Sequence, residues 1–126
     1  MVNMENFDYH NENPFDLREN DCTIRAITFV TGLDYYTVKR KMELVSELLE
    51  CTATCPCCYF HLIDYVFKFP RVNCRGMTVG EFAKRHPKGI YLIRMDGHIS
   101  SIMDGRVKDT FDCTDYIATD CWFCGY

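Results

Sequence analysis

The stretch Asn20-Asp21-Cys22-Thr23-Ile24-Arg25-Ala26-Ile27 leads from a polar pair and a cysteine directly into an apolar run that ends at Gly32. Asp is a favoured N-cap residue and Gly a favoured helix stop, so we expect a helix from Cys22 to about Thr31. Cys22 then lies in the first turn, where unpaired N–H groups and the helix dipole favour a thiolate. This position makes Cys22 a candidate nucleophile, and a small buried residue at a helix start is the alternative.

The composition is that of one soluble globular domain. The 126 residues are 48% hydrophobic and 25% charged, which is enough for a core without help from disulfides or metal. No apolar run approaches the roughly 18 residues of a membrane span, and the first residues carry no export signal. We therefore expect a cytoplasmic protein without membrane contact. A net charge of −4 and the lack of a Lys/Arg cluster argue against nucleic acid as a partner.

The chain divides into three parts by composition and period. Residues 1–19 are rich in Asn, Asp and Glu and predict an extended arm, whose isolated apolar anchors would pack on the body: Phe7, Tyr9, Pro14 and Phe15. Residues 20–86 predict a helical half, and residues 89–126 predict an antiparallel sheet. Residues 1–126 should thus form a single α+β domain, with N-terminal helices packed on a C-terminal antiparallel sheet.

Local signals place the remaining helices. Asp34 is an N-cap for a helix over about 35–50, whose apolar face we expect to carry Val38, Met42, Val45 and Leu49. Residues 59–69 are apolar enough for a short buried helix or strand, and the pattern leaves both open. A Thr-x-x-Glu capping box at 78–81 predicts a short helix over 79–85.

After these helices the spacing of the apolar residues changes to that of short strands separated by turn residues. This pattern predicts strands at 90–95, 98–103, 106–111 and 116–123. Asp104-Gly105 is the strongest hairpin signal, because a two-residue type I′ turn requires positive φ at both positions. Such a turn places Met103 opposite Arg106 and Ile102 opposite Val107.

His98 begins the second of these strands and is the histidine best placed to meet Cys22. With the predicted turn, His98 shares a sheet face with Ser100, Asp109 and Phe111. Asp109 then lies diagonally near His98, where it can orient the imidazole and stabilise its charged form. A shift of the turn by one residue would place Asp112 there instead.

A cysteine that opens an early helix, followed by His and then Asp on successive strands of a late sheet, resembles the papain-like cysteine peptidases. More closely, the chain resembles a family of small bacteriophage and bacterial proteins that look like short relatives of the bacteriocin-processing C39 peptidases. The matching pieces occur in one order over residues 20–112: Asp21-Cys22-Thr23-Ile24-Arg25-Ala26-Ile27, Met77-Thr78-Val79-Gly80-Glu81-Phe82, Gly97-His98, Asp104-Gly105 and Asp109-Thr110-Phe111-Asp112.

The resemblance implies a papain-like fold and a cysteine hydrolase of phage or mobile-element origin, which acts on a peptide, isopeptide or other acyl bond. Cys22 would be the nucleophile, His98 the general base and Asp109 the orienting residue. In papain-like enzymes a Gln before the cysteine stabilises the oxyanion, and Asp16 occupies that position here. The negative charge of Asp16 would oppose an oxyanion. We therefore expect the amide of Asn20 and the N–H of Cys22 to stabilise the oxyanion instead. An inactive binding or decoy protein, directed at a host protein or a nucleotide signal, is the alternative.

The chain has nine cysteines, which we expect to be reduced in the cytoplasm. Two C-x-x-C spacings match the chelating spacing of zinc knuckles, and they predict a structural zinc held by Cys55, Cys58, Cys121 and Cys124. A redox dithiol and cysteines without a ligand are the alternatives. No other cofactor is expected.

Overall fold

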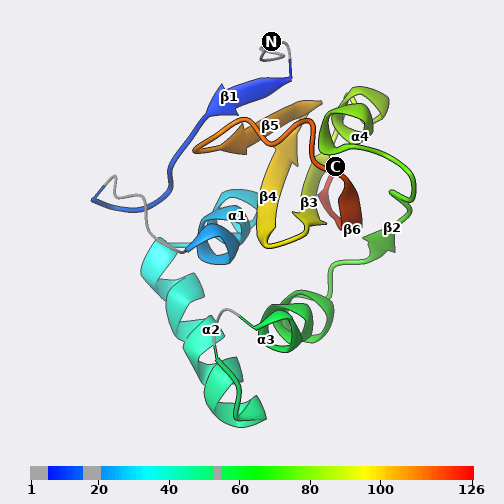
Figure 1. The fold of residues 1–126 in the computed structure, drawn as a ribbon. Helices are drawn as coiled ribbons and strands as arrows, with labels where there is room; N and C mark the ends of the chain where they lie inside the picture. The colour runs from blue at the N-terminus through cyan, green and yellow to red at the C-terminus, as the bar shows by residue number, and fades with distance from the viewer. Residues whose placement is uncertain (1–5, 16–20, 53–54) are drawn as a thin grey trace.

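The computed structural model describes residues 6–15, 21–52 and 55–126. In these ranges the chain forms an α+β fold with four α-helices and a six-stranded mixed sheet of order β1-β5-β4-β3-β6-β2 (Figure 1). The strands are β1 (Phe7–Tyr9), β2 (Arg71–Val72), β3 (Ile90–Met95), β4 (His98–Met103), β5 (Arg106–Asp109) and β6 (Ala118–Gly125). No helix in the described ranges is long and apolar enough to cross a membrane.

Helix α1 (Cys22–Thr31) has the predicted bounds. It ends because Gly32 adopts a left-handed φ of 71° and donates its N–H to the carbonyl of Thr28. Asp21 occupies the N-cap position, but its side chain accepts no helix N–H. The Asp21 carboxylate turns instead toward the interior, where it takes part in the site described below.

Helix α2 (Tyr35–Leu49) is capped as expected, because the Asp34 carboxylate accepts the N–H groups of Tyr36 and Thr37. Val38, Met42 and Val45 are buried along one face, together with Tyr35. Leu49 was expected on this face and is partly exposed. It is the last residue of the helix.

The segment left open between helix and strand is helical. It forms α3 (Pro56–His61) and then a π-helical turn, η1 (Leu62–Val66). Pro56 suits the first position of α3, since its fixed φ is helical and its missing N–H has no helical partner. Helix α4 (Val79–Arg85) starts with the predicted capping box of Thr78 and Glu81, with both hydrogen bonds formed.

Helices cover both faces of the sheet (Figure 1). On one face, α1, α2, α3 and η1 share a core with the central strands, which includes Ile27, Val38, Leu62, Leu92, Ile99 and Trp122. On the other face, α4 packs over a second core, which includes Val79, Phe82, Ile93, Ile102, Val107 and Cys121. Because α1 rests on β4, the start of α1 is held near the start of that strand.

The β4–β5 hairpin has the predicted turn and register. Asp104 and Gly105 have φ values of 50° and 79°, as a type I′ turn requires. Met103 pairs with Arg106 and Ile102 with Val107. The turn therefore fixes which residue of β5 lies beside His98.

The strands within residues 89–126 pair antiparallel as predicted. The whole sheet is mixed, because β1, which was expected to be part of an extended arm, adds to the edge of β5 in parallel. Asp8 holds it there through two 2.7 Å hydrogen bonds from the Arg106 guanidinium and a contact with Lys108. The expected packing of the arm holds for Phe7, which contacts the second core. It is wrong for the other described anchors, since Pro14 is exposed, Tyr9 is 58% exposed and Phe15 is 73% exposed.

Candidate active site

The site begins with Cys22, the first residue of α1. Its half-buried thiol lines one cavity together with His98 and Ile99, and the electrostatic influence of both residues reaches it. Burial raises the pKa of the Cys22 thiol, but the hydrogen bond and charge of His98, together with the Ile99 N–H, outweigh burial and leave the pKa below its ordinary value. The surroundings of Cys22 therefore favour a thiolate.

His98 is the first residue of β4 and follows the turn at Gly97, whose φ is 74°. Its Nε2 lies 2.6 Å from Oδ2 of Asp109, and its ring lies against Phe111 with centroids 4.8 Å apart. Burial lowers the pKa of His98, but the hydrogen bonds and charges of Asp109 and Cys22 raise it further, to about 9. The two shifts act together, since one favours a thiolate on Cys22 and the other a proton on His98.

Asp109 is the last residue of β5 and is only 2% exposed. Burial raises the pKa of this carboxyl, and the hydrogen bond from His98 then lowers it below its ordinary value. The Thr110 N–H donates to Oδ1 at 2.7 Å, and Arg25 Nη1 lies 3.3 Å from the same oxygen. These contacts hold a charged carboxylate in the interior beside the imidazole.

The alternative third residue, Asp112, faces elsewhere. Its Oδ1 accepts the Thr114 N–H at 3.0 Å and the Thr114 hydroxyl at 2.6 Å, so it closes the turn after β5. Of the two carboxylates left open by the sequence, Asp109 is the one bonded to His98.

Arg25 is a buried residue of the site that the sequence analysis missed. Its Nε donates to Asp21 Oδ1 at 2.7 Å, while its Nη1 reaches Asp109, so one guanidinium lies between two buried carboxylates. Asp21 also accepts the Tyr35 hydroxyl at 2.7 Å and the Asn13 amide at 3.1 Å. This network ties the start of α1 to the end of β5, which fixes Cys22 relative to Asp109.

Two sequence signals could have revealed this network. Asp21 and Arg25 are four residues apart, so they meet on one side of a helical turn. Arg25 also interrupts the apolar face of α1, between Ile24 and Ala26, and a charge in such a position needs a buried partner.

A cavity of about 400 Å³ opens beside the thiol. It is lined by residues that include Cys22, Ile24, Tyr59, Arg94, Asp96 and His98. Arg94 donates to the Tyr59 hydroxyl at 2.6 Å and pairs with Asp120 at 3.0 Å, so its charge is largely compensated. The cavity places a mixed polar and apolar wall next to the Cys22 thiol.

One expected oxyanion donor can be placed and one cannot. The N–H of Cys22 belongs to the first turn of α1, where N–H groups have no intrahelical acceptor. Asn20, the other expected donor, lies outside the described residues, as does Asp16. The oxyanion role of Asn20 therefore stays a prediction.

The four cysteines predicted to hold zinc do not come together. Cys121 and Cys124 project to opposite faces of β6: Cys121 is in the second core, and Cys124 packs on the first. The buried Cys58 thiol contacts the Met42 carbonyl at 3.6 Å. The prediction of a zinc site formed by Cys55, Cys58, Cys121 and Cys124 is therefore wrong. Side chains alternate along a strand, so two residues three positions apart point to opposite faces of the sheet.

Among the described residues, two other groups have metal-ligating atoms close together. One comprises Cys51, Cys55 and Cys57, and the other comprises His98, Asp109 and Cys113. In the second group, the His98 and Asp109 side chains already bond to each other. Burial raises the pKa of Cys113 to about 12, so this thiol stays protonated beside Asp109.

Comparison of the chain with protein-family models, with curated proteins and with solved structures found no match. The case for a function accordingly rests on the geometry of the Cys22 site.

Proposed function

We propose that this chain is a cysteine hydrolase with a papain-like site, in which Cys22 attacks an acyl carbon, His98 transfers protons and Asp109 orients the imidazole. One observation carries the proposal: Cys22, His98 and Asp109 interact in a row although α1, β4 and β5 are separate elements. A helix bearing the cysteine rests on the strand bearing the histidine, which is the arrangement that the papain-like resemblance implies.

The first half of the reaction follows from the protonation of the pair. The Cys22 thiolate attacks the carbonyl carbon, and negative charge develops on the carbonyl oxygen beside the Cys22 N–H. Since Nε2 of His98 is bonded to Asp109, we assign proton transfer to Nδ1, the other ring nitrogen. Nδ1 gives its proton to the leaving amine or alkoxide, the bond to the leaving group breaks, and a thioester to Cys22 remains.

The second half returns the site to its starting state. Neutral His98 accepts a proton from water at Nδ1, and the hydroxide attacks the thioester carbonyl. The C–S bond then breaks, and the Cys22 thiolate and protonated His98 are restored. Asp109 keeps its charge throughout and stabilises the imidazolium at the start and end of each cycle.

The cavity sets limits on the substrate. About 400 Å³ is near the small end of ligand-binding pockets, which suits a short acyl group or a single side chain of a peptide or protein substrate. We place the reaction in the cytoplasm, where a low-pKa thiol stays reduced.

Acylation by p-nitrophenyl acetate tests this proposal without knowledge of the natural substrate. We expect a burst of nitrophenol, an acetyl group on the peptide that contains Cys22, and slow release of acetate. Cys22→Ser and His98→Ala should abolish the burst. Cys124→Ser is the matched control, because burial raises the pKa of that half-buried thiol to about 12 and so disfavours its thiolate.

Melting temperatures of the variants should be measured alongside, because they distinguish loss of the burst in a folded variant from loss of the fold. Acetylation of Cys22 without release of acetate would contradict a hydrolase and favour a binding protein that retains the site. Acetylation that is no faster at Cys22 than at the exposed Cys57 would contradict the role of Cys22 as the nucleophile.

A further inference from the structure

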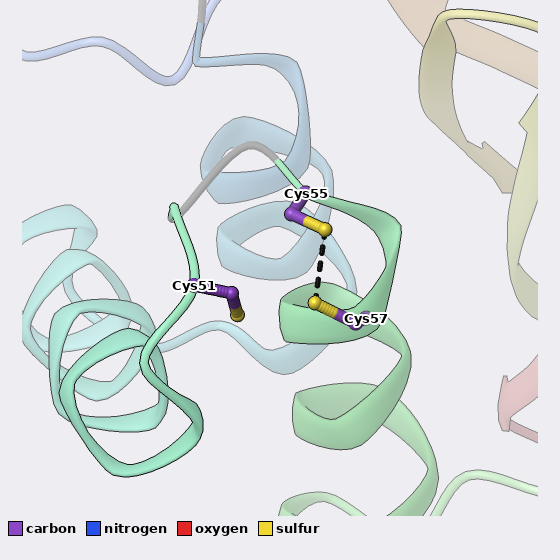
Figure 2. A group of neighbouring side chains, drawn as sticks. All are labelled: Cys51, Cys55 and Cys57. Atoms are coloured by element: carbon purple, nitrogen blue, oxygen red, sulfur yellow. Dashed lines mark hydrogen bonds between the residues drawn. The ribbon is translucent and has the colours of Figure 1, made fainter.

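Three cysteines gather where α2 gives way to α3 (Figure 2). Cys51 follows the end of α2, Cys55 is the N-cap of α3, and Cys57 lies in its first turn. Their sulfur atoms all lie within 4.8 Å of one another, and the Sγ atoms of Cys55 and Cys57 are 2.9 Å apart. All three are free thiols.

We propose that Cys51, Cys55 and Cys57 bind one zinc ion. Thiolates are preferred ligands of zinc, and three of them converge here from two sides of one short connection. Cys57 is exposed and the other two are half-buried, so an ion can reach the sulfurs from solvent. The exposure also leaves a fourth position for water.

The spacing of the sulfurs fits a zinc ion after a small adjustment. With Zn–S bonds of about 2.3 Å, sulfurs around a tetrahedral ion lie about 3.8 Å apart. The Cys55–Cys57 pair at 2.9 Å must therefore open, while the two sulfur distances to Cys51 are no longer than 4.8 Å. Rotation of the exposed Cys57 side chain is sufficient for this opening.

Zinc binding displaces the protons of the three thiols, because the thiolate is the form of cysteine that ligates the ion.

The other cysteines do not extend this cluster. Cys58 follows Cys57 directly but is buried and contacts the Met42 carbonyl. Cys121 interacts with Cys74 in the second core, and Cys124 contacts the Trp122 carbonyl. The ligands of this site therefore come from one junction, unlike the pairing of C-x-x-C motifs predicted from the sequence.

Bound zinc would fix the start of α3 against the end of α2. Pro56 lies between two of the ligands in the chain and also lines the cavity beside Cys22. The site would thus set one wall of that cavity. It stands independently of the proposed hydrolase activity, since it rests on other residues and other distances.

The test is titration of the fully reduced, chelator-stripped protein with cobalt and then zinc. We expect one ion per chain, with thiolate-to-cobalt charge-transfer bands that zinc abolishes. Loss of a residue that only orients a metal ligand weakens metal binding by about 10–100-fold. Cys55→Ser and Cys57→Ser each remove a ligand itself, so each should weaken zinc binding by more than this. Cys124→Ser should bind zinc as the unaltered protein does.

A failure of the reduced protein to bind zinc at micromolar concentrations would overturn the proposal. So would zinc binding that Cys51→Ser, Cys55→Ser and Cys57→Ser all leave unchanged. Circular dichroism of each variant separates loss of a ligand from loss of the fold. Because binding is read directly, the result does not depend on whether Cys22 is acylated.

Discussion

Nε2 of His98 lies 2.6 Å from Oδ2 of Asp109, and this contact joins the first residue of β4 to the last residue of β5. It occupies one nitrogen of the ring and leaves the other for Cys22. Because both residues belong to one hairpin, the turn at Asp104 and Gly105 sets their relative positions.

The first prediction concerns the charge on His98. Its pKa of about 9 should appear as a histidine resonance that titrates well above the ordinary value of 6.5. Since the folded pKa is the higher one, the stability that His98 contributes is fully present below about pH 6.5 and is lost as the pH rises through about 9. NMR titration of histidine-labelled protein measures this pKa, and His98→Ala assigns the resonance.

Asp109→Asn should lower the pKa of His98 by about one unit or more, because the amide keeps the shape and removes the charge. Asp112→Asn is the matched control and should leave the pKa unchanged, since Asp112 bonds to Thr114. An equal effect of the two substitutions would contradict the assignment of Asp109.

The second prediction concerns Arg25. Arg25→Met should reduce the free energy of unfolding by about 3–5 kcal/mol, because it leaves two buried carboxylates, Asp21 and Asp109, without their shared cation. Arg40→Met is the control: Arg40 forms only an exposed pair with Glu47 at 3.8 Å and should change stability by less than about 1 kcal/mol. Urea unfolding of both variants measures the difference, and similar losses would contradict a structural role for the buried network.

The third prediction is a pH dependence of stability that arises from Glu12. Burial raises the pKa of this carboxyl to about 7. The folded chain therefore binds the proton more tightly than the unfolded chain, and this stabilisation is full below about pH 4.5 and is lost as the pH rises through about 7.

Glu12→Gln removes the buried charge and keeps the size of the side chain. It should stabilise the protein by on the order of 2 kcal/mol near pH 8 and by little near pH 4.5. Glu43→Gln, at an exposed position on α2, is the control. Urea unfolding at both pH values gives the comparison, and a Glu12→Gln effect that does not vary with pH would be inconsistent with this titration.

The fourth prediction isolates a steric contact under the hairpin turn. Gly76 and Gly105 have the same φ of +79°, but only at Gly105 would an added Cβ meet other atoms, the Ala83 carbonyl oxygen at 3.2 Å and the Pro87 Cα at 3.3 Å. Gly76→Ala should cost about 1–2 kcal/mol for the backbone conformation alone. Gly105→Ala should cost at least about 1 kcal/mol more. Thermal or urea unfolding measures both, and equal costs would show that α4 does not press on the turn.

Local signals in the sequence were sufficient for much of this structure. Gly32 and Asp34 delimit two helices through their own backbone and side-chain chemistry, so the bounds of α1 and the start of α2 were predictable. The Asp104-Gly105 turn fixed the register of β4 on β5, and that register led to the pairing of His98 with Asp109. The contact of α1 with β4, which brings Cys22 to His98, was implied by the family resemblance.

Features that depend on distant partners were not predictable in this way. The parallel addition of β1 depends on Asp8 meeting Arg106, almost one hundred residues along the chain. The side chain of Asp21 leaves its capping role because Arg25, Tyr35 and Asn13 surround it. Spacing of cysteines along the sequence likewise did not show which thiols meet.

The central claim is that His98 activates Cys22, and limiting alkylation by iodoacetamide at neutral pH tests it most directly. Because the thiolate fraction controls the rate, Cys22 should be modified before Cys57, and His98→Ala should slow modification of Cys22 by about tenfold or more while Cys57 reacts as before. Peptide mapping by mass spectrometry resolves the two sites. A Cys22 that reacts more slowly than Cys57, or at the same rate with and without the His98 imidazole, would contradict the claim.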